Sequence, residues 1–104
     1  MINLFDHLPD RTAEEVFTEV LLRKHVRIER IVSTGQSTPL DKPHLQKHDE
    51  WVLVLAGAAG LRIEGEEERK LGPGDHILIP ADRPHWVTWT EKDGPTIWLA
   101  VHFA

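Results

Sequence analysis

The amino-acid sequence predicts an all-β protein, a sandwich or barrel of short antiparallel strands. Segments in which apolar and β-branched residues recur at close to period two follow one another along the chain. Each later segment except the last ends at Gly, Pro or Asp, and strands at roughly 8 to 12-residue spacing are typical of a sandwich or barrel. Helical periodicity competes in one place only.

That place is the first strand. Residues 15–22 and 25–33 alternate as strands, and in the second the set Val26, Ile28, Arg30 and Val32 opposes Arg27, Glu29 and Ile31, so one face is expected to be buried. However, residues 10–25 also have acidic residues early and basic residues late, and Asp10 or Thr12 could cap a helix there. Both alternatives stay open for this segment.

The rest of the chain predicts strands separated by turns. After an irregular loop rich in Gly and Pro, the expected strands cover residues 48–57, 59–65, 66–75, 76–84, 85–94 and 95–103. Pro73 and Gly74 predict a tight turn, because proline presets φ and glycine accepts positive φ.

Length and composition narrow the class of protein. The 104 residues predict a single domain, residues 1–104, and the formal net charge of −5 without a basic stripe argues against nucleic acid as a partner. No stretch is long and apolar enough to span a bilayer. Cysteine is absent, so a metal would need imidazole, carboxylate or amide ligands, and we expect a cytoplasmic protein with no membrane partner.

Two motifs now combine. "PHLQKHDEWVLVLAG" (residues 43–57) and "LGPGDHILIPADRPHWV" (residues 71–87) resemble the paired motifs of the cupin family of small β-barrels. The resemblance covers roughly residues 35 to 90 and implies a double-stranded β-helix, or jelly-roll barrel, with the N-terminal strands added to it. It also implies a divalent metal ion such as Zn, Fe, Mn, Ni or Co, and a homodimer.

The family's metal-binding positions fall on His44, Gln46, Glu50 and His85, so the resemblance implies these four residues as ligands. Gln46 is the departure, because the family has a second histidine there. An amide oxygen is a weak, neutral ligand beside an imidazole, so we expect lower affinity and a preference for hard or borderline ions.

The alternation of side chains supports the same grouping. If residues 44–54 are extended, His44, Gln46, His48 and Glu50 share one face, which continues into apolar residues. Alternative interpretations remain: His44 and His48 could be solvated loop residues. His48, or His102 on the last strand, could instead bind the metal in place of Gln46 or support its ligands by a hydrogen bond.

The expected function is a metal-binding cupin that acts on or binds an unidentified small molecule in the barrel mouth. If it is an enzyme, it would be a metal-dependent dioxygenase or isomerase. The alternative is a metal-free or non-catalytic binding or sensing module, which Gln46 favours. The four tryptophans at 51, 86, 89 and 98 could line the cavity, although core or dimer packing is the more ordinary use.

Overall fold

The computed structural model describes residues 2–104, and within them it contains eight β-strands and no helix, which confirms the predicted all-β class. The strands are β1 (Val16–Arg23), β2 (Val26–Ser33), β3 (Asp49–Ala56), β4 (Ala59–Ile63), β5 (Arg69–Leu71), β6 (His76–Ile79), β7 (His85–Thr90) and β8 (Thr96–Phe103). No helix of a length and hydropathy suited to crossing a membrane occurs in this part of the chain.

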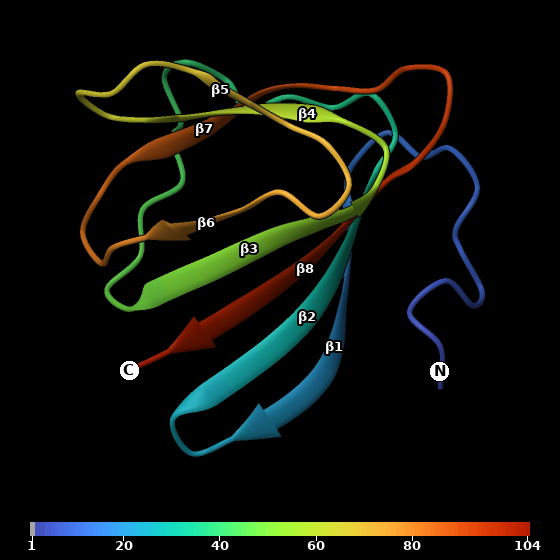
Figure 1. Cartoon of the computed structure of the whole chain (residues 1–104), viewed down its shortest axis with the longest axis horizontal. Coiled ribbons are helices and arrows are strands. Elements are labelled where there is room, and N and C mark those ends of the chain that lie inside the picture. The colour runs from blue at the N-terminus through green and yellow to red at the C-terminus, as the bar shows by residue number, and fades with distance from the viewer. Residues whose placement is uncertain (1) are drawn as a thin grey trace.

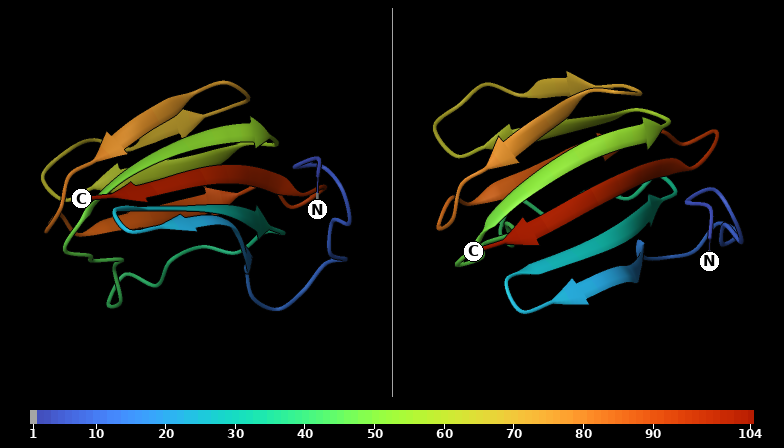
Figure 2. Two further views of the ribbon diagram at one scale, coloured as in Figure 1. Left: turned by 90° about the horizontal axis from the view of Figure 1, so that it is seen from below. Right: turned by 60° about the horizontal axis from the view of Figure 1, so that its bottom comes forward.

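The strands form two antiparallel sheets that lie face to face (Figure 1, Figure 2). One sheet has the order β1-β2-β8-β3-β6 and the other has the order β5-β4-β7. The last strand, β8, lies between β2 and β3, so strands from both ends of the chain pair at the centre of the larger sheet. This is the jelly-roll arrangement expected from the paired motifs.

The core fills the space between the two sheets. On β3 the buried residues alternate, because Val52 and Val54 point inward while Trp51, Leu53 and Leu55 lie on the outer face, half-buried. The opposite sheet contributes Leu61 and other residues of β4. The main buried cluster is Val52, Val54, Ala59, Leu61, Ile63, Leu71, Ile77, Ile79, Trp98 and Ala100.

Residues 16–23 form a strand and not a helix. β1 pairs with β2 along its whole length, for example Phe17 with Ile31, with a register shift between Glu19 and Leu21. Both patterns were compatible with the local sequence. The ladder of backbone hydrogen bonds to β2 is a tertiary contribution that local periodicity does not contain.

Most of the expected strands have different bounds in the structure: those expected over residues 76–84 and 85–94 end at Ile79 and Thr90. The strand expected over residues 66–75 shrinks to the three residues of β5, because residues 64–68 and 72–75 are turns and coil. The extended run expected over residues 44–54 is broken too, since β3 begins only at Asp49 and His44 makes an isolated bridge to His85.

The charged face of β2 lines the interior cavity, and its aliphatic face points outward. Arg30, on that outer face, is buried because the N-terminal segment covers it: Arg30 Nη1 donates to the carbonyl oxygens of Asp6 (2.6 Å) and Leu4 (3.2 Å). The N-terminal segment therefore shields Arg30 on the outer face of β2, while the opposite face of the strand lies against the cavity.

Candidate functional site

A cavity of about 170 Å³ lies between the sheets and collects most of the titratable side chains predicted for the site. Its polar lining includes His44, Gln46, Glu50, His85 and His102. Its apolar walls come from both sheets: Val52, Leu61, Ile79, Val87 and Trp98. The four residues that the resemblance implied as ligands therefore share one cavity.

Strand register explains why residues far apart in sequence meet here. In the larger sheet Arg27 of β2 pairs with His102 of β8, and His102 pairs in turn with Glu50 of β3. Directly opposed residues in neighbouring strands share a face of the sheet. Arg27, His102 and Glu50 thus form one row across the cavity-facing side.

His85 enters the cavity as a neutral hydrogen-bond acceptor. It is the first residue of β7 and is 4% exposed. Its Nδ1 lies 3.0 Å from the carbonyl oxygen of Arg83, and because a carbonyl can only accept, Nδ1 carries the proton. Burial lowers the pKa of His85, which favours the neutral ring. Its Nε2 therefore presents a lone pair to the cavity.

Glu50 faces that lone pair. Its Oε1 lies 3.7 Å from His85 Nε2, and its side chain is also buried, at 7% exposed. The same oxygen accepts a 2.6 Å hydrogen bond from Gln46 Nε2. Within residues 2–104 no lysine or arginine forms an ion pair with Glu50, so the charge of this buried carboxylate has no fixed cationic partner.

His44 reaches the site through backbone pairing. Its N–H donates to the His85 carbonyl (2.9 Å) and the His85 N–H donates back (3.0 Å). The two imidazole rings are stacked with centroids 5.5 Å apart and planes 28° apart. His44 is exposed, in contrast to His85. The isolated bridge between His44 and His85 therefore brings His44 to the cavity, although residues 44–48 do not form a continuous strand.

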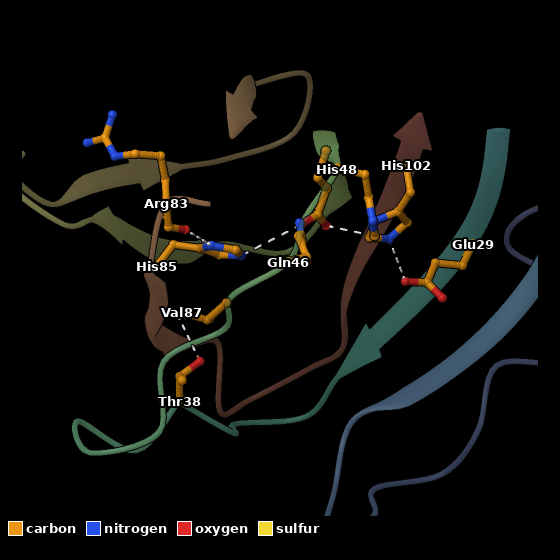
Figure 3. A network of polar contacts seen from close by, with 9 residues as sticks. Glu29, Thr38, Gln46, His48, Arg83, His85, Val87 and His102 are labelled. Carbon is orange, nitrogen blue, oxygen red and sulfur yellow. Dashed lines mark hydrogen bonds and ion pairs between the residues drawn. The ribbon is translucent and has the colours of Figure 1, made fainter. Parts of the chain in front are cut away.

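His102 and His48 belong to a neighbouring polar chain (Figure 3). His102 Nε2 donates to Glu29 Oε1 at 2.9 Å, and its Nδ1 lies 2.9 Å from His48 Nε2. The hydrogen bond from His102 lowers the pKa of Glu29, with burial opposing it. His102 Nε2 also lies 3.9 Å from Glu50 Oε2. Because this nitrogen donates its proton to Glu29, it has no free lone pair to offer to the cavity.

Sequence reasoning missed Glu29, Arg27 and Glu15, which also line the cavity. The signal for the first two was present, since charged residues alternate with aliphatic ones along β2, but a charged face ordinarily indicates solvent. Of the four tryptophans, only Trp98 lines the cavity, and its Nε1 donates to Ser33 Oγ at 3.1 Å.

A metal ion needs several donor atoms close enough to bind it together. As the side chains stand in residues 2–104, no three histidine, aspartate or glutamate side chains form a group that could hold a metal ion. The donor chemistry nevertheless suits one: a neutral imidazole fixed by a backbone carbonyl, a buried carboxylate without a cationic partner, a second imidazole and an amide.

A two-sheet antiparallel barrel with histidines, a glutamine and a glutamate in one cavity defines a cupin. The chain matches the cupin domain family over residues 29–102 and belongs to that family.

Among solved structures, it is similar over 97% of its length to a putative mannose-6-phosphate isomerase from Ralstonia eutropha JMP134, with 43% identity, 94% of that chain covered and a TM-score of 0.94. Dimethylsulfoniopropionate lyase DddQ from Ruegeria pomeroyi is 43% identical over 42 residues, which are 40% of this chain and 21% of the lyase. The match therefore spans about a fifth of that curated relative. TT1209 from Thermus thermophilus shares the fold at 24% identity, with a TM-score of 0.82 and 99% and 95% of the two chains covered.

Proposed function

We propose that this cupin holds a divalent metal ion at His44, Gln46, Glu50 and His85 and binds a small molecule beside it. The observation that carries the proposal is the pairing of His85 Nε2 with Glu50 Oε1 at 3.7 Å inside the cavity. Both atoms are electron-pair donors, and both side chains are buried.

Two facing lone pairs are unfavourable unless a cation lies between them. The separation is too long for a hydrogen bond. It is shorter than two metal–ligand bonds of about 2.1 Å placed end to end, so one ion can bond both atoms. The Arg83 carbonyl holds the His85 ring in the tautomer that binds metal, as outer hydrogen bonds do in metal sites.

Gln46 completes the set in a weaker way than an imidazole would. Its amide nitrogen now donates to Glu50, so its oxygen becomes available as a ligand only when the amide turns over. When bound, an ion here would supply Lewis-acid chemistry to a ligand in the cavity. Val52, Ile79 and Trp98 would exclude water around that ligand.

The size of the cavity limits the ligand. About 170 Å³ is below the roughly 300–1,000 Å³ typical of sites for drug-sized molecules. A ligand of metabolite size fits this space. The isomerase and lyase names of the relatives support conversion of such a molecule, and an isomerase or dioxygenase type of reaction is our expectation if the chain is an enzyme.

A second candidate is a metal-free cupin that binds or senses a small molecule. The hydrogen bond from Gln46 to Glu50 favours it, because it satisfies one carboxylate oxygen without an ion. The two candidates differ in metal content and not in the location of the ligand.

Elemental analysis of protein purified without an affinity tag or added metal distinguishes them. Glu50→Gln and His85→Ala each remove one donor, and His76→Ala is the matched control because His76 is exposed on the outer face of β6. We expect close to one equivalent of Zn, Fe, Mn, Ni or Co in the parent chain and in the control, and loss of the metal in both site variants.

A parent chain that contains no metal and binds none of these ions when they are added would overturn the proposal. The metal-free candidate would then take its place. Circular dichroism of each variant checks that lost metal does not reflect lost folding.

A further inference from the structure

Arg27 lies in a wall between two hollows. It lines the interior cavity and also a second hollow of about 210 Å³, at the end of the barrel where β1 turns into β2. We name this second hollow the basic hollow. Its lining residues are Leu22, Arg23, Lys24, His25, Val26, Arg27, His48, His102, Phe103 and Ala104.

The side chain of Arg27 is 42% exposed, but its Nε is buried. Among the described residues this Nε has no hydrogen-bond partner. The nearest carboxylate contact is with Glu29, whose Oε2 lies 4.0 Å from that Nε, which is too far for a hydrogen bond. A buried N–H left unpaired is costly, so this position favours a ligand that accepts a hydrogen bond.

The two acidic residues that line the cavity beside Arg27 each accept one hydrogen bond, and Glu29 Oε2 stays 4.0 Å from Arg27 Nε. Glu29 Oε1 receives the 2.9 Å hydrogen bond of His102, and Glu15 accepts a hydrogen bond from Ser33 Oγ. Within residues 2–104, no aspartate or glutamate side chain lines the basic hollow. Arg23 and Lys24 add positive charge around Arg27 on the side of the basic hollow, so the field there favours an anion over a cation, whereas Glu15, Glu29 and Glu50 line the interior cavity on its other side.

We propose that Arg27 binds an oxyanion group, carboxylate or phosphate, of the ligand that occupies the cavity. The inference rests on the proposed function in that it takes the cavity as the ligand site. The fork of N–H donors in arginine matches either oxyanion in a bidentate way.

The row across the sheet also sets a length for the ligand. Arg27 and Glu50 are separated by one strand, β8, so their backbones lie two strand spacings apart, about 10 Å. A ligand anchored at Arg27 would extend past His102 toward Glu50 and His85. The ligand is therefore a small anionic molecule whose charged group is several bonds away from the part that lies near Glu50.

NMR titration of the ¹⁵N-labelled full chain tests this assignment at neutral pH in the presence of a chelator. Inorganic phosphate is the probe in one arm and acetate in the other, at constant ionic strength. We expect a saturable shift of the Arg27 Nε–H signal, larger for the oxyanion that the site prefers. The anion that binds more tightly indicates whether the natural ligand carries a phosphate ester or a carboxylate.

Three variants accompany the titration. Arg27→Gln should weaken the binding of the preferred anion about tenfold or more, because a charge-assisted hydrogen bond is lost. Arg27→Lys should retain part of the affinity, since it keeps the charge but not the fork. Arg69→Gln, an exposed residue of β5, should bind as the parent chain does.

Absence of a saturable shift in both arms, or equal affinity in the parent chain and Arg27→Gln, would overturn the inference. The parent titration does not depend on any variant folding. It also does not depend on metal: metal without anion binding removes this inference alone, and anion binding without metal removes the metal proposal and leaves Arg27 as an anion site.

Discussion

His85 and Glu50 point their electron pairs at one another across 3.7 Å of a buried cavity. The His85 tautomer follows from the carbonyl of Arg83, and Glu50 is placed by its position on the inner face of β3. The arrangement therefore follows from backbone geometry at two separate strands. Such an arrangement would keep both donors in place before an ion arrived, as the proposed metal site requires.

Gln46→His should strengthen metal binding. An imidazole is a stronger ligand for borderline divalent ions than an amide oxygen, and position 46 already reaches Glu50. We expect affinity for Zn²⁺ or Ni²⁺ to rise about tenfold or more, as changes around metal sites commonly do. Competition with a chromophoric chelator measures this change.

Leu45→His is the matched control for that variant. It adds a histidine at the adjacent position, where the side chain is 63% exposed and does not line the cavity. An equal gain in affinity from both variants would mean that any added histidine in this loop binds metal, and position 46 would lose its special role.

The stabilisation of the fold by Glu29 should be lost in acid. Its pKa is lowered from the ordinary value of 4.5, chiefly by the hydrogen bond from His102, so the unfolded chain binds the proton more readily than the folded chain. The stabilisation is fully present above about pH 4.5 and is lost as the pH falls through the lowered pKa. Urea unfolding from pH 7 to pH 3 should show the gap between the parent chain and Glu29→Gln closing in acid.

Glu67→Gln is the control for that profile, because Glu67 is an exposed carboxylate in the turn between β4 and β5. A gap between the parent chain and Glu29→Gln that stays constant down to pH 3 would contradict the assignment of acid sensitivity to Glu29.

Gly57→Ala should cost much more stability than Gly65→Ala. Both glycines have positive φ, +85° and +83°, so an alanine at either costs about 1–2 kcal/mol in backbone strain. A Cβ at Gly57 would also lie 2.7 Å from the Pro95 carbonyl oxygen, whereas no atom of residues 2–104 would lie within 4 Å of a Cβ at Gly65. The free energy of unfolding measured in urea should therefore be about 1–3 kcal/mol lower for Gly57→Ala than for Gly65→Ala. Equal losses of stability in the two variants would show that the loop before Thr96 moves aside without cost.

The fold could be predicted from the sequence because period-two alternation and turn residues act locally. Glu50 and His85 could be expected to share one cavity, as they do, because each stands at a fixed offset within a motif that also forms its strand. The alternation pattern and the motif offsets can both be read within short stretches of the chain. The family match confirms the cupin assignment that these stretches supported.

Arg27 and Glu29 could not be placed in the same way. They line the cavity because β2 pairs with β8 in a register that sets Arg27 opposite His102, and register between strands so far apart in sequence is a tertiary property. The same limit applies to His48. It was expected to share a face with Gln46 and Glu50, but the chain leaves the strand conformation at residues 45–48, and His48 lines the basic hollow.

The outer face of the larger sheet leads to the last prediction, a homodimer. Half-buried apolar side chains cover this face on β3 and β8, namely Trp51, Leu53, Leu55, Leu99, Val101 and Phe103, and Leu78 of β6 is 49% exposed beside them. Monomers rarely expose so continuous an apolar surface.

Trp51→Ala should raise the dissociation constant of the homodimer about 30-fold, as loss of a central aromatic side chain commonly does. Sedimentation velocity over a concentration series measures this constant, with Leu45→Ala as an exposed control away from that face. Because the face lies opposite the cavity, full chelation should leave the dimer intact, and a dimer that dissociates on chelation would place the contact at the metal site instead.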